Sequence, residues 1–185
     1  MEQYTLRSNR WNEAAKYGLL LGLIPTAYLY LGHLQMAIGA TGFISSALGF
    51  ILWAAKFVGC IKLVKYVMIK FASANPSATN SDIFKLGTLM AMLSALVYSV
   101  VAVADILYIF PEYYQGVYAA MIEEYSQVLP AGSVDEIKEV LLNAPKITFV
   151  GTFLYCFLFG TVLSLILSRN IPPQNPFSNY KPDEQ

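Results

Sequence analysis

Four apolar stretches constrain this chain more than any other feature of its sequence. They are residues 17–36, 42–61, 86–110 and 147–168. A helix rises about 1.5 Å per residue, so about 20 apolar residues cross the hydrocarbon core of a bilayer. Unpaired backbone groups are costly in hydrocarbon, which excludes open strands there. The sequence therefore predicts an all-α integral membrane protein with a four-transmembrane-helix bundle as a single membrane domain over residues 1–185.

Composition and charge agree with a chain whose first partner is the lipid bilayer. Of the 185 residues, 56% are hydrophobic and 13% are charged, whereas soluble domains carry about 25% charged residues. Twelve Lys and Arg balance twelve Asp and Glu, so no nucleic-acid partner is expected. The first apolar stretch could instead be a cleaved signal peptide. Its apolar core is too long for that, and the best cleavage site would put Ile38 and Ala40 at the two positions that need small residues, of which Ile38 is large.

The basic residues predict the orientation of the chain. Nine of them lie before the first stretch, between the second and third, or after the fourth: Arg7, Arg10, Lys16, Lys62, Lys65, Lys70, Lys85, Arg169 and Lys181. Only Lys138 and Lys146 lie between the third and fourth stretches. Cationic flanks stay in the cytoplasm, so both termini, the polar loop 71–84 and the tail 169–185 are expected there. Ser81 or Asp82 is a candidate cap for the third helix.

The segment 111–146 is then expected outside the cytoplasm, as an amphipathic helical hairpin. Tyr114, Tyr118, Met121 and Tyr125 recur at helical spacing. A second helix is expected to open with Ser133 and Glu136 as a capping box. The hairpin would lie on the outer membrane surface or over the mouth of the bundle. Its aromatic face is either a membrane-interface anchor or a surface that binds a protein partner.

Asp105 is an acidic residue inside the third apolar stretch. It lies roughly 28 Å along that helix from residue 86, in the outer layer of the membrane, on the face of Gly87, Ala91 and Ser94. His33 reaches a similar height on the first helix. The two could form a proton-responsive pair. Alternatively, Asp105 caps local backbone or meets outer water, and His33 only ends its helix.

Lys56 is a second charge within an apolar stretch, in the inner half of the second helix. Its long stem could carry the ammonium to the cytoplasmic head groups. The alternative is a role in binding a substrate inside the membrane. Asp105, His33 and Lys56 together are the candidate intramembrane polar site.

No sequence motif predicts catalysis. The chain has one His and two Cys, and it contains no zinc, phosphate-loop or nucleophile motif. Cys60 is expected near the cytoplasmic end of its helix and Cys156 in mid-membrane, so a disulfide is not expected. We therefore expect no catalytic residues, no cofactor and no metal site.

Three segments resemble a known family. They read WNEAAKYGLLLGLI, SDIFKLGTLMAMLSALVYSV and ILYIFPEYY, and they look like the Bacteroidetes membrane family called domain of unknown function 4199. The resemblance covers most of residues 11–168. It implies a four-helix protein of the bacterial inner (cytoplasmic) membrane with no assigned activity and no catalytic residues to carry over. It also implies relatives that are often encoded beside a membrane glycosyltransferase.

Three functional hypotheses follow. The first is a non-catalytic accessory or scaffold subunit with a membrane-protein partner, in an envelope glycan or lipid pathway. The second is a small oligomeric transporter or channel, motivated by Asp105, His33 and Lys56. The third is a membrane enzyme that acts on a lipid-linked substrate, motivated by the tyrosines and acids of residues 111–146.

Overall fold

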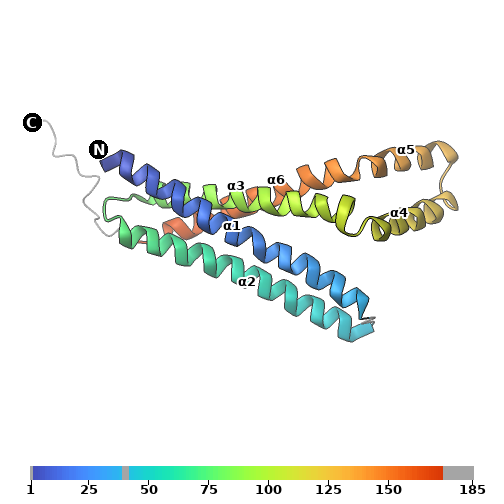
Figure 1. The fold of residues 1–185 in the computed structure, drawn as a ribbon, viewed down its shortest axis with the longest axis horizontal. Coiled ribbons are helices and arrows are strands. Elements are labelled where there is room, and N and C mark those ends of the chain that lie inside the picture. The colour runs from blue at the N-terminus through green and yellow to red at the C-terminus, as the bar shows by residue number, and fades with distance from the viewer. Residues whose placement is uncertain (1, 39–41, 173–185) are drawn as a thin grey trace, which may run out of the picture.

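The computed structural model describes residues 2–38 and 42–172, and every element in them is helical (Figure 1). In chain order they are α1 (Glu2–Ala37), α2 (Gly42–Ala74), α3 (Asn80–Ala104), the π-helical segment η1 (Asp105–Ile109), α4 (Pro111–Ser126), α5 (Ala131–Leu142) and α6 (Ala144–Arg169). The tail predicted over residues 169–185 lies mostly outside the described residues.

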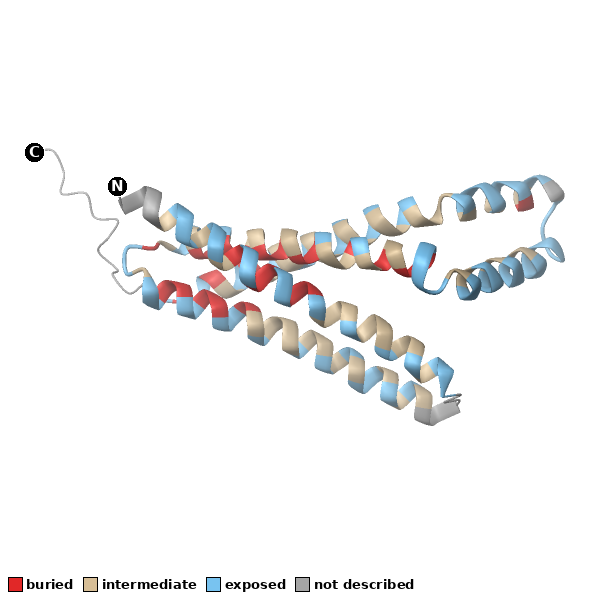
Figure 2. Ribbon diagram, in the orientation of Figure 1, coloured by how far each residue is buried: buried red, intermediate tan, exposed pale blue. Residues whose placement is uncertain are grey.

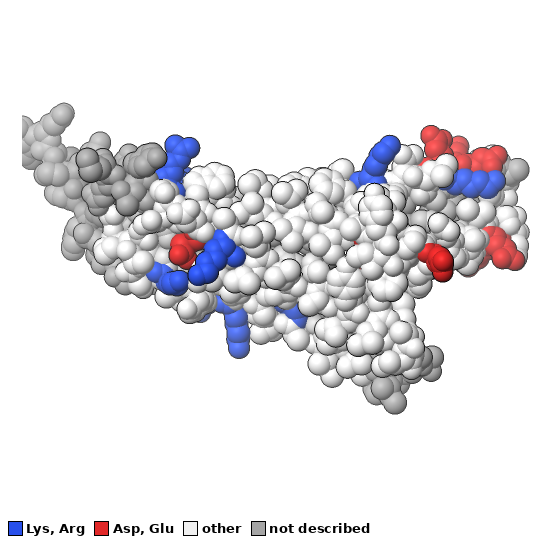
Figure 3. All heavy atoms as spheres, viewed as in Figure 1, with Lys and Arg blue, Asp and Glu red and all other residues white. Residues whose placement is uncertain are grey.

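Four of these helices are long and apolar enough to cross a membrane. The candidate spans are Leu6–Ala37, Ser45–Ala74, Asn80–Ile109 and Ala144–Arg169. This confirms the prediction of four long apolar helices. In the view of Figure 3, most Lys and Arg atoms lie over one end of the four helices and most Asp and Glu atoms over α4 and α5, with a mostly uncharged band between them. Such a distribution fits a membrane protein.

The helices extend beyond the apolar stretches seen in the sequence. In α2 the buried residues Val64, Val67, Met68 and Phe71 recur at helical spacing, while the lysines of the same segment are exposed. This amphipathic pattern continues the helix to Ala74. The loop predicted over residues 71–84 therefore shortens to residues 75–79.

The start of α3 corrects a second expectation. Its N-cap is Thr79, whose side chain accepts a hydrogen bond from the Asp82 backbone N–H while the Asp82 carboxylate accepts from the Thr79 backbone. Neither Ser81 nor Asp82 is the cap; Asp82 instead completes a capping box from the third helical position. Asp82 also pairs with Arg10 at 2.9 Å, which ties α1 to the start of α3.

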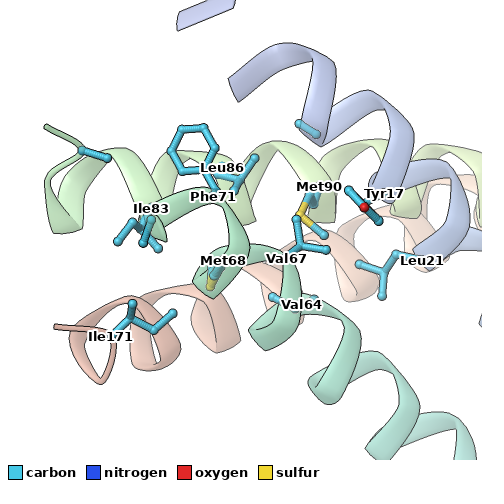
Figure 4. Packing of buried hydrophobic residues seen from close by; sticks show 13 residues of the cluster. Tyr17, Leu21, Val64, Val67, Met68, Phe71, Ile83, Leu86, Met90 and Ile171 are labelled. Carbon is cyan, nitrogen blue, oxygen red and sulfur yellow. The ribbon is translucent and has the colours of Figure 1, made fainter. Parts of the chain in front are cut away.

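The main hydrophobic core lies where α1 and α3 begin and α2 ends; we call this the closed end of the molecule. Tyr17, Met68, Phe71, Leu86 and Met90 meet there (Figure 4). Ile171, just after α6, is buried in the same cluster. Figure 2 shows most of the buried residues gathered at this end.

Small residues bring α3 against both of its main neighbours. A Cβ added at Gly22 of α1 would lie 2.9 Å from Val97 Cβ, and one at Gly160 of α6 would lie 2.6 Å from Ala91 Cβ. Gly18 likewise has no room for a Cβ beside Leu93. The Gly18–Gly22 pair therefore forms a close contact between helices, as its spacing predicts.

The opposite end of the four helices, which we call the open end, is not closely packed. There α1 and α2 lean away from α3 and α6 (Figure 1). The residues of α2 near this end include Phe50, Ile51 and Trp53, all of which are exposed. The sequence predicts a four-helix bundle, but at this end small residues such as Gly32 of α1 meet no neighbouring helix, and α2 instead exposes large side chains.

The helices α4 and α5 lie side by side and prolong α3 and α6 past the tips of α1 and α2 (Figure 1). They do not fold back over the bundle, because only Phe110 separates η1 from α4 and only Asn143 separates α5 from α6. The N-cap of α5 is Pro130. The capping box predicted at Ser133 and Glu136 is therefore wrong, since Ser133 already lies inside the helix.

Candidate functional site

Asp105 occupies the junction of α3 and η1, and its side chain has no exposed surface. Its Oδ2 accepts a hydrogen bond from the Tyr114 hydroxyl at 2.7 Å and lies 2.8 Å from His33 Nε2. Because an ionised carboxylate can only accept, Nε2 carries the proton of the second bond. We call His33, Asp105 and Tyr114 the polar clamp; it joins α1, α3 and α4.

The polar clamp depends on the π-helical turn. The Phe110 backbone N–H donates to the Asp105 carbonyl at 2.9 Å, five residues back. On a regular α-helix Asp105 and Tyr114, nine residues apart, would point about 180° away from each other. The extra residue of η1 and the non-helical backbone of Phe110 before Pro111, with φ −129° and ψ 47°, change that register. Both side chains can then meet.

Aromatic rings enclose the imidazole of His33. The ring of Phe110 lies 4.4 Å from it between centroids, and Tyr113 meets it edge-on at 5.6 Å. Tyr30, one turn earlier in α1, lies 6.5 Å away. These contacts leave the His33 side chain 13% exposed. The side chains of the polar clamp thus link α1 and α3 near the open end.

The electrostatics of the polar clamp favour a protonated Tyr114. Burial, together with the hydrogen bond to Asp105, raises the pKa of the Tyr114 hydroxyl well above its usual value. Burial also raises the pKa of Tyr118, the next aromatic residue on that face. Within the described residues, Asp105 Oδ1 is buried without a hydrogen-bond partner. The carboxylate can therefore accept one further donor.

Lys56 does not join the polar clamp. Its Nζ lies over the ring of Tyr28 in α1, 4.1 Å from the centroid. A cation over an aromatic face is attracted by the negative face of the ring. In the structure the ammonium is thus held against the neighbouring helix and not beside Lys62. Of the three candidate polar residues, the structure brings together His33 and Asp105 and places Lys56 elsewhere.

Lys56 lines a cavity between α2 and α6. The cavity has a volume of about 420 Å³, and residues of α1 and α3 contribute to its wall. Trp53 and Phe57 from α2 and Tyr155 and Phe159 from α6 supply aromatic surface to it. A second, smaller cavity of about 300 Å³ lies beside Lys70 at the closed end.

The four residues expected on a partner surface have different surroundings. Tyr114 belongs to the polar clamp and Tyr118 is half-buried, with their rings 6.3 Å apart. Met121 and Tyr125 are exposed, as are Val128 and Leu129 just beyond α4. We call Met121, Tyr125, Val128 and Leu129 the tip patch, because they lie at the end of α4 that is farthest from the transmembrane helices.

The described part of the chain, 2–38 and 42–172, holds no group of three His, Cys, Asp or Glu side chains that could bind a metal ion. Cys60 and Cys156 are free thiols, and both line the cavity beside Lys56.

Sequence reasoning did not assign Tyr28 and Tyr114 to these polar sites. Tyr28 could have been found, because the short connection between α1 and α2 makes these helices antiparallel neighbours and places Tyr28 and Lys56 at comparable heights. The role of Tyr114 could not have been found from the sequence, since the position of its side chain depends on the π-helical turn.

Comparisons with family models, with curated proteins and with solved structures find no match for this chain. Membership of the family that the sequence resembles stays a prediction.

Proposed function

We propose that this chain is a non-catalytic accessory or scaffold subunit of the bacterial inner membrane that presents the α4–α5 hairpin to a membrane-protein partner. The pathway we propose for the pair is the assembly of an envelope glycan or lipid.

The observation that carries this proposal is the projecting hairpin. It extends past the tips of α1 and α2 (Figure 1), and no residue of α4 is buried. The tip patch is apolar and exposed, with Val128 at 76%. Exposed apolar patches on a rigid projection are typical of protein interaction sites. The polar clamp supports the same role, because it fixes the base of α4 to α1 and α3.

The orientation follows from the charges. The closed end carries Arg7, Arg10, Lys62, Lys65 and Lys70, and cationic flanks stay in the cytoplasm. We propose cytoplasmic termini and a hairpin that faces the periplasm.

The test is affinity purification from native membranes in mild detergent, followed by mass spectrometry. We compare the wild-type protein with a tip variant that carries Tyr125→Ser and Val128→Ser. The control is Glu123→Ser, on the opposite face of α4. We expect a stoichiometric membrane protein with the wild type and the control, and its loss with the tip variant. Recovery of a lone monomer in all three preparations would refute the proposal.

One observation favours a second candidate, a small oligomeric transporter or channel. Asp105 is a fully buried carboxylate between membrane helices, paired with His33, and buried acids in membranes often mark ion pathways. If this candidate holds, Asp105→Asn fails to complement a deletion strain and the purified protein is a homo-oligomer. Full complementation by Asp105→Asn and by Lys56→Met would exclude it.

A further inference from the structure

Lys56 is a cation in the middle of a membrane-spanning helix. At 1.5 Å per residue it lies about 21 Å along α2 from Gly42 and about 27 Å from Ala74. None of the ion pairs within residues 2–38 and 42–172 involves it. The face of the Tyr28 ring is the partner that the structure gives its ammonium. Such a cation is costly in hydrocarbon unless an anion joins it.

The cavity beside Lys56 has the size and lining of a small-molecule site. Its volume of about 420 Å³ lies within the range of about 300–1,000 Å³ that is usual for ligand pockets. Most of the wall is apolar. Polar side chains also reach it from α3 and α6, among them Ser94, Tyr98 and Thr152. In such a site the charged group and the hydroxyls bind the polar head of a ligand. The apolar wall contacts the remainder of the ligand.

Ring contacts between α2 and α6 limit what can enter the cavity. Trp53 stacks on Phe57 at 5.4 Å, and Phe57 of α2 contacts Phe159 of α6 at 5.0 Å between ring centroids. These rings form an aromatic ridge between α2 and α6. A transmembrane helix is about 10 Å across. Because rings of α2 and α6 are in contact, the space between these two helices is too narrow to admit another helix. A single flexible hydrocarbon chain can lie along the ridge.

We propose that this cavity binds a single-chain amphiphile with an oxyanion head, taken up from the bilayer between α2 and α6. The carboxylate or phosphate head pairs with Lys56 and accepts hydrogen bonds from the neighbouring hydroxyls. The hydrocarbon chain packs against the aromatic ridge. This site is separate from the tip patch and goes beyond the proposed function.

The experiment uses the full-length protein in nanodiscs of zwitterionic lipid. Palmitic acid that carries a diazirine is photolysed in the sample, and the labelled peptides are identified by mass spectrometry. We expect labels on α2 and α6 beside the cavity. Unlabelled palmitate should displace the probe, and uncharged hexadecanol should not. Hexadecyl phosphate as a second competitor distinguishes the two heads: stronger competition than palmitate identifies a phosphate ligand, and weaker competition a carboxylate.

Variants test the role of the charge. Lys56→Met should weaken displaceable labelling about tenfold, since one charge-assisted contact is lost. Lys56→Arg should retain most of it. Lys62→Met is the matched control, an exposed lysine of the same helix, and should leave labelling unchanged.

Two results would overturn the proposal, the first measured on the wild-type chain and the second on a chain with a photoreactive residue in place of Trp53. Equal displacement by hexadecanol and palmitate would show that no oxyanion is recognised. A photoreactive residue at position 53 that captures a second protein chain and excludes the palmitate probe would show that the cavity is a helix-binding site.

Discussion

Asp105 depends on two donors from other elements of the molecule. A carboxylate with no exposed surface has lost its water, and the Tyr114 hydroxyl and His33 Nε2 replace part of that hydration. If one donor is removed, the carboxylate stays buried and still carries the free-energy cost of desolvation, but it has one hydrogen bond fewer to offset that cost. A conservative substitution in the polar clamp should therefore be more destabilising than the same substitution at an exposed residue nearby.

The first prediction compares two adjacent tyrosines. Tyr114→Phe should lower the free energy of unfolding in detergent micelles by about 1.5–3 kcal/mol, because it removes a hydrogen bond to a buried carboxylate. Tyr113→Phe should change it by less than about 0.5 kcal/mol, since its exposed hydroxyl donates to the weak acceptor Met36 Sδ. In a double-mutant cycle, Tyr114→Phe and Asp105→Asn should couple by about 1 kcal/mol. Equal effects of the two tyrosine variants would contradict the role of the polar clamp.

The second prediction concerns pH. Burial and the hydrogen bond to Asp105 raise the pKa of Tyr114 above the ordinary value of about 10. The folded state therefore holds this proton more tightly than the unfolded state. Its contribution to stability is complete below a pH of about 10 and is lost as the pH rises through the raised pKa.

Tyrosinate absorbance measures this shift. At a pH of about 11, above the ordinary tyrosine pKa, folded wild type and folded Tyr114→Phe should give the same signal. In denaturant the wild type should show one more tyrosinate. Asp105→Asn should lower the pKa of Tyr114 only in part, because burial is the larger cause. An extra tyrosinate already present in the folded wild type would contradict the prediction.

At the scale of the elements, α3 is the helix on which the membrane part is assembled. It packs against α1 through Gly18 and Gly22 and against α6 through Gly87 and Gly160. These positions lie toward the closed end or in mid-helix, where backbones must come close. The packing could be predicted from the sequence, since small residues at four-residue spacing mark such contacts.

The third prediction tests this packing with two glycines of α1. Gly22→Ala should lower the free energy of unfolding by about 1–3 kcal/mol, because the new Cβ would overlap Val97 and crowd the Ser94 carbonyl. Gly32→Ala should be neutral or slightly stabilising, since no atom lies within 4 Å of its Cβ position and Ala favours a helix over Gly. If the two variants behaved alike in thermal unfolding, the close contact of α1 and α3 would be refuted.

The polar clamp could be predicted only in part from the sequence. The height and face of Asp105 and His33 follow from helix geometry, so their pairing could be expected. Tyr114 lies on the opposite face in any regular helix. Its contact requires the π-helical turn, which depends on long-range packing and on the break before Pro111.

At the scale of the whole molecule, the sequence predicts the number of apolar helices and not how far they diverge. Hydropathy depends only on local composition. The distance between α2 and α6 depends also on how large side chains such as Trp53, Phe57 and Phe159 pack between them, and residues far apart in the sequence decide that packing. The cavity beside Lys56 lies between these helices, and its position could not be foreseen from the sequence. The length of α2 was missed for a related reason, since its last turns are amphipathic and not uniformly apolar.

The fourth prediction tests the proposed orientation. The background is a chain in which Cys60 and Cys156 are changed to serine. A single cysteine then replaces either Gln127, at the tip of the hairpin, or Ser77, in the connection between α2 and α3. Both positions are exposed. In intact spheroplasts an impermeant maleimide should label Gln127→Cys and not Ser77→Cys. After lysis both should react. The reverse pattern in intact spheroplasts would contradict the orientation.

The measurement that most directly tests the central claim, that the projecting hairpin binds a partner, is photocrosslinking in living cells. A photoreactive amino acid is placed at Tyr125 in the tip patch or at Glu123 on the opposite face of α4. We predict a discrete adduct with one membrane protein from position 125 and none from position 123. No protein adduct from position 125, or the same adducts from both positions, would contradict it.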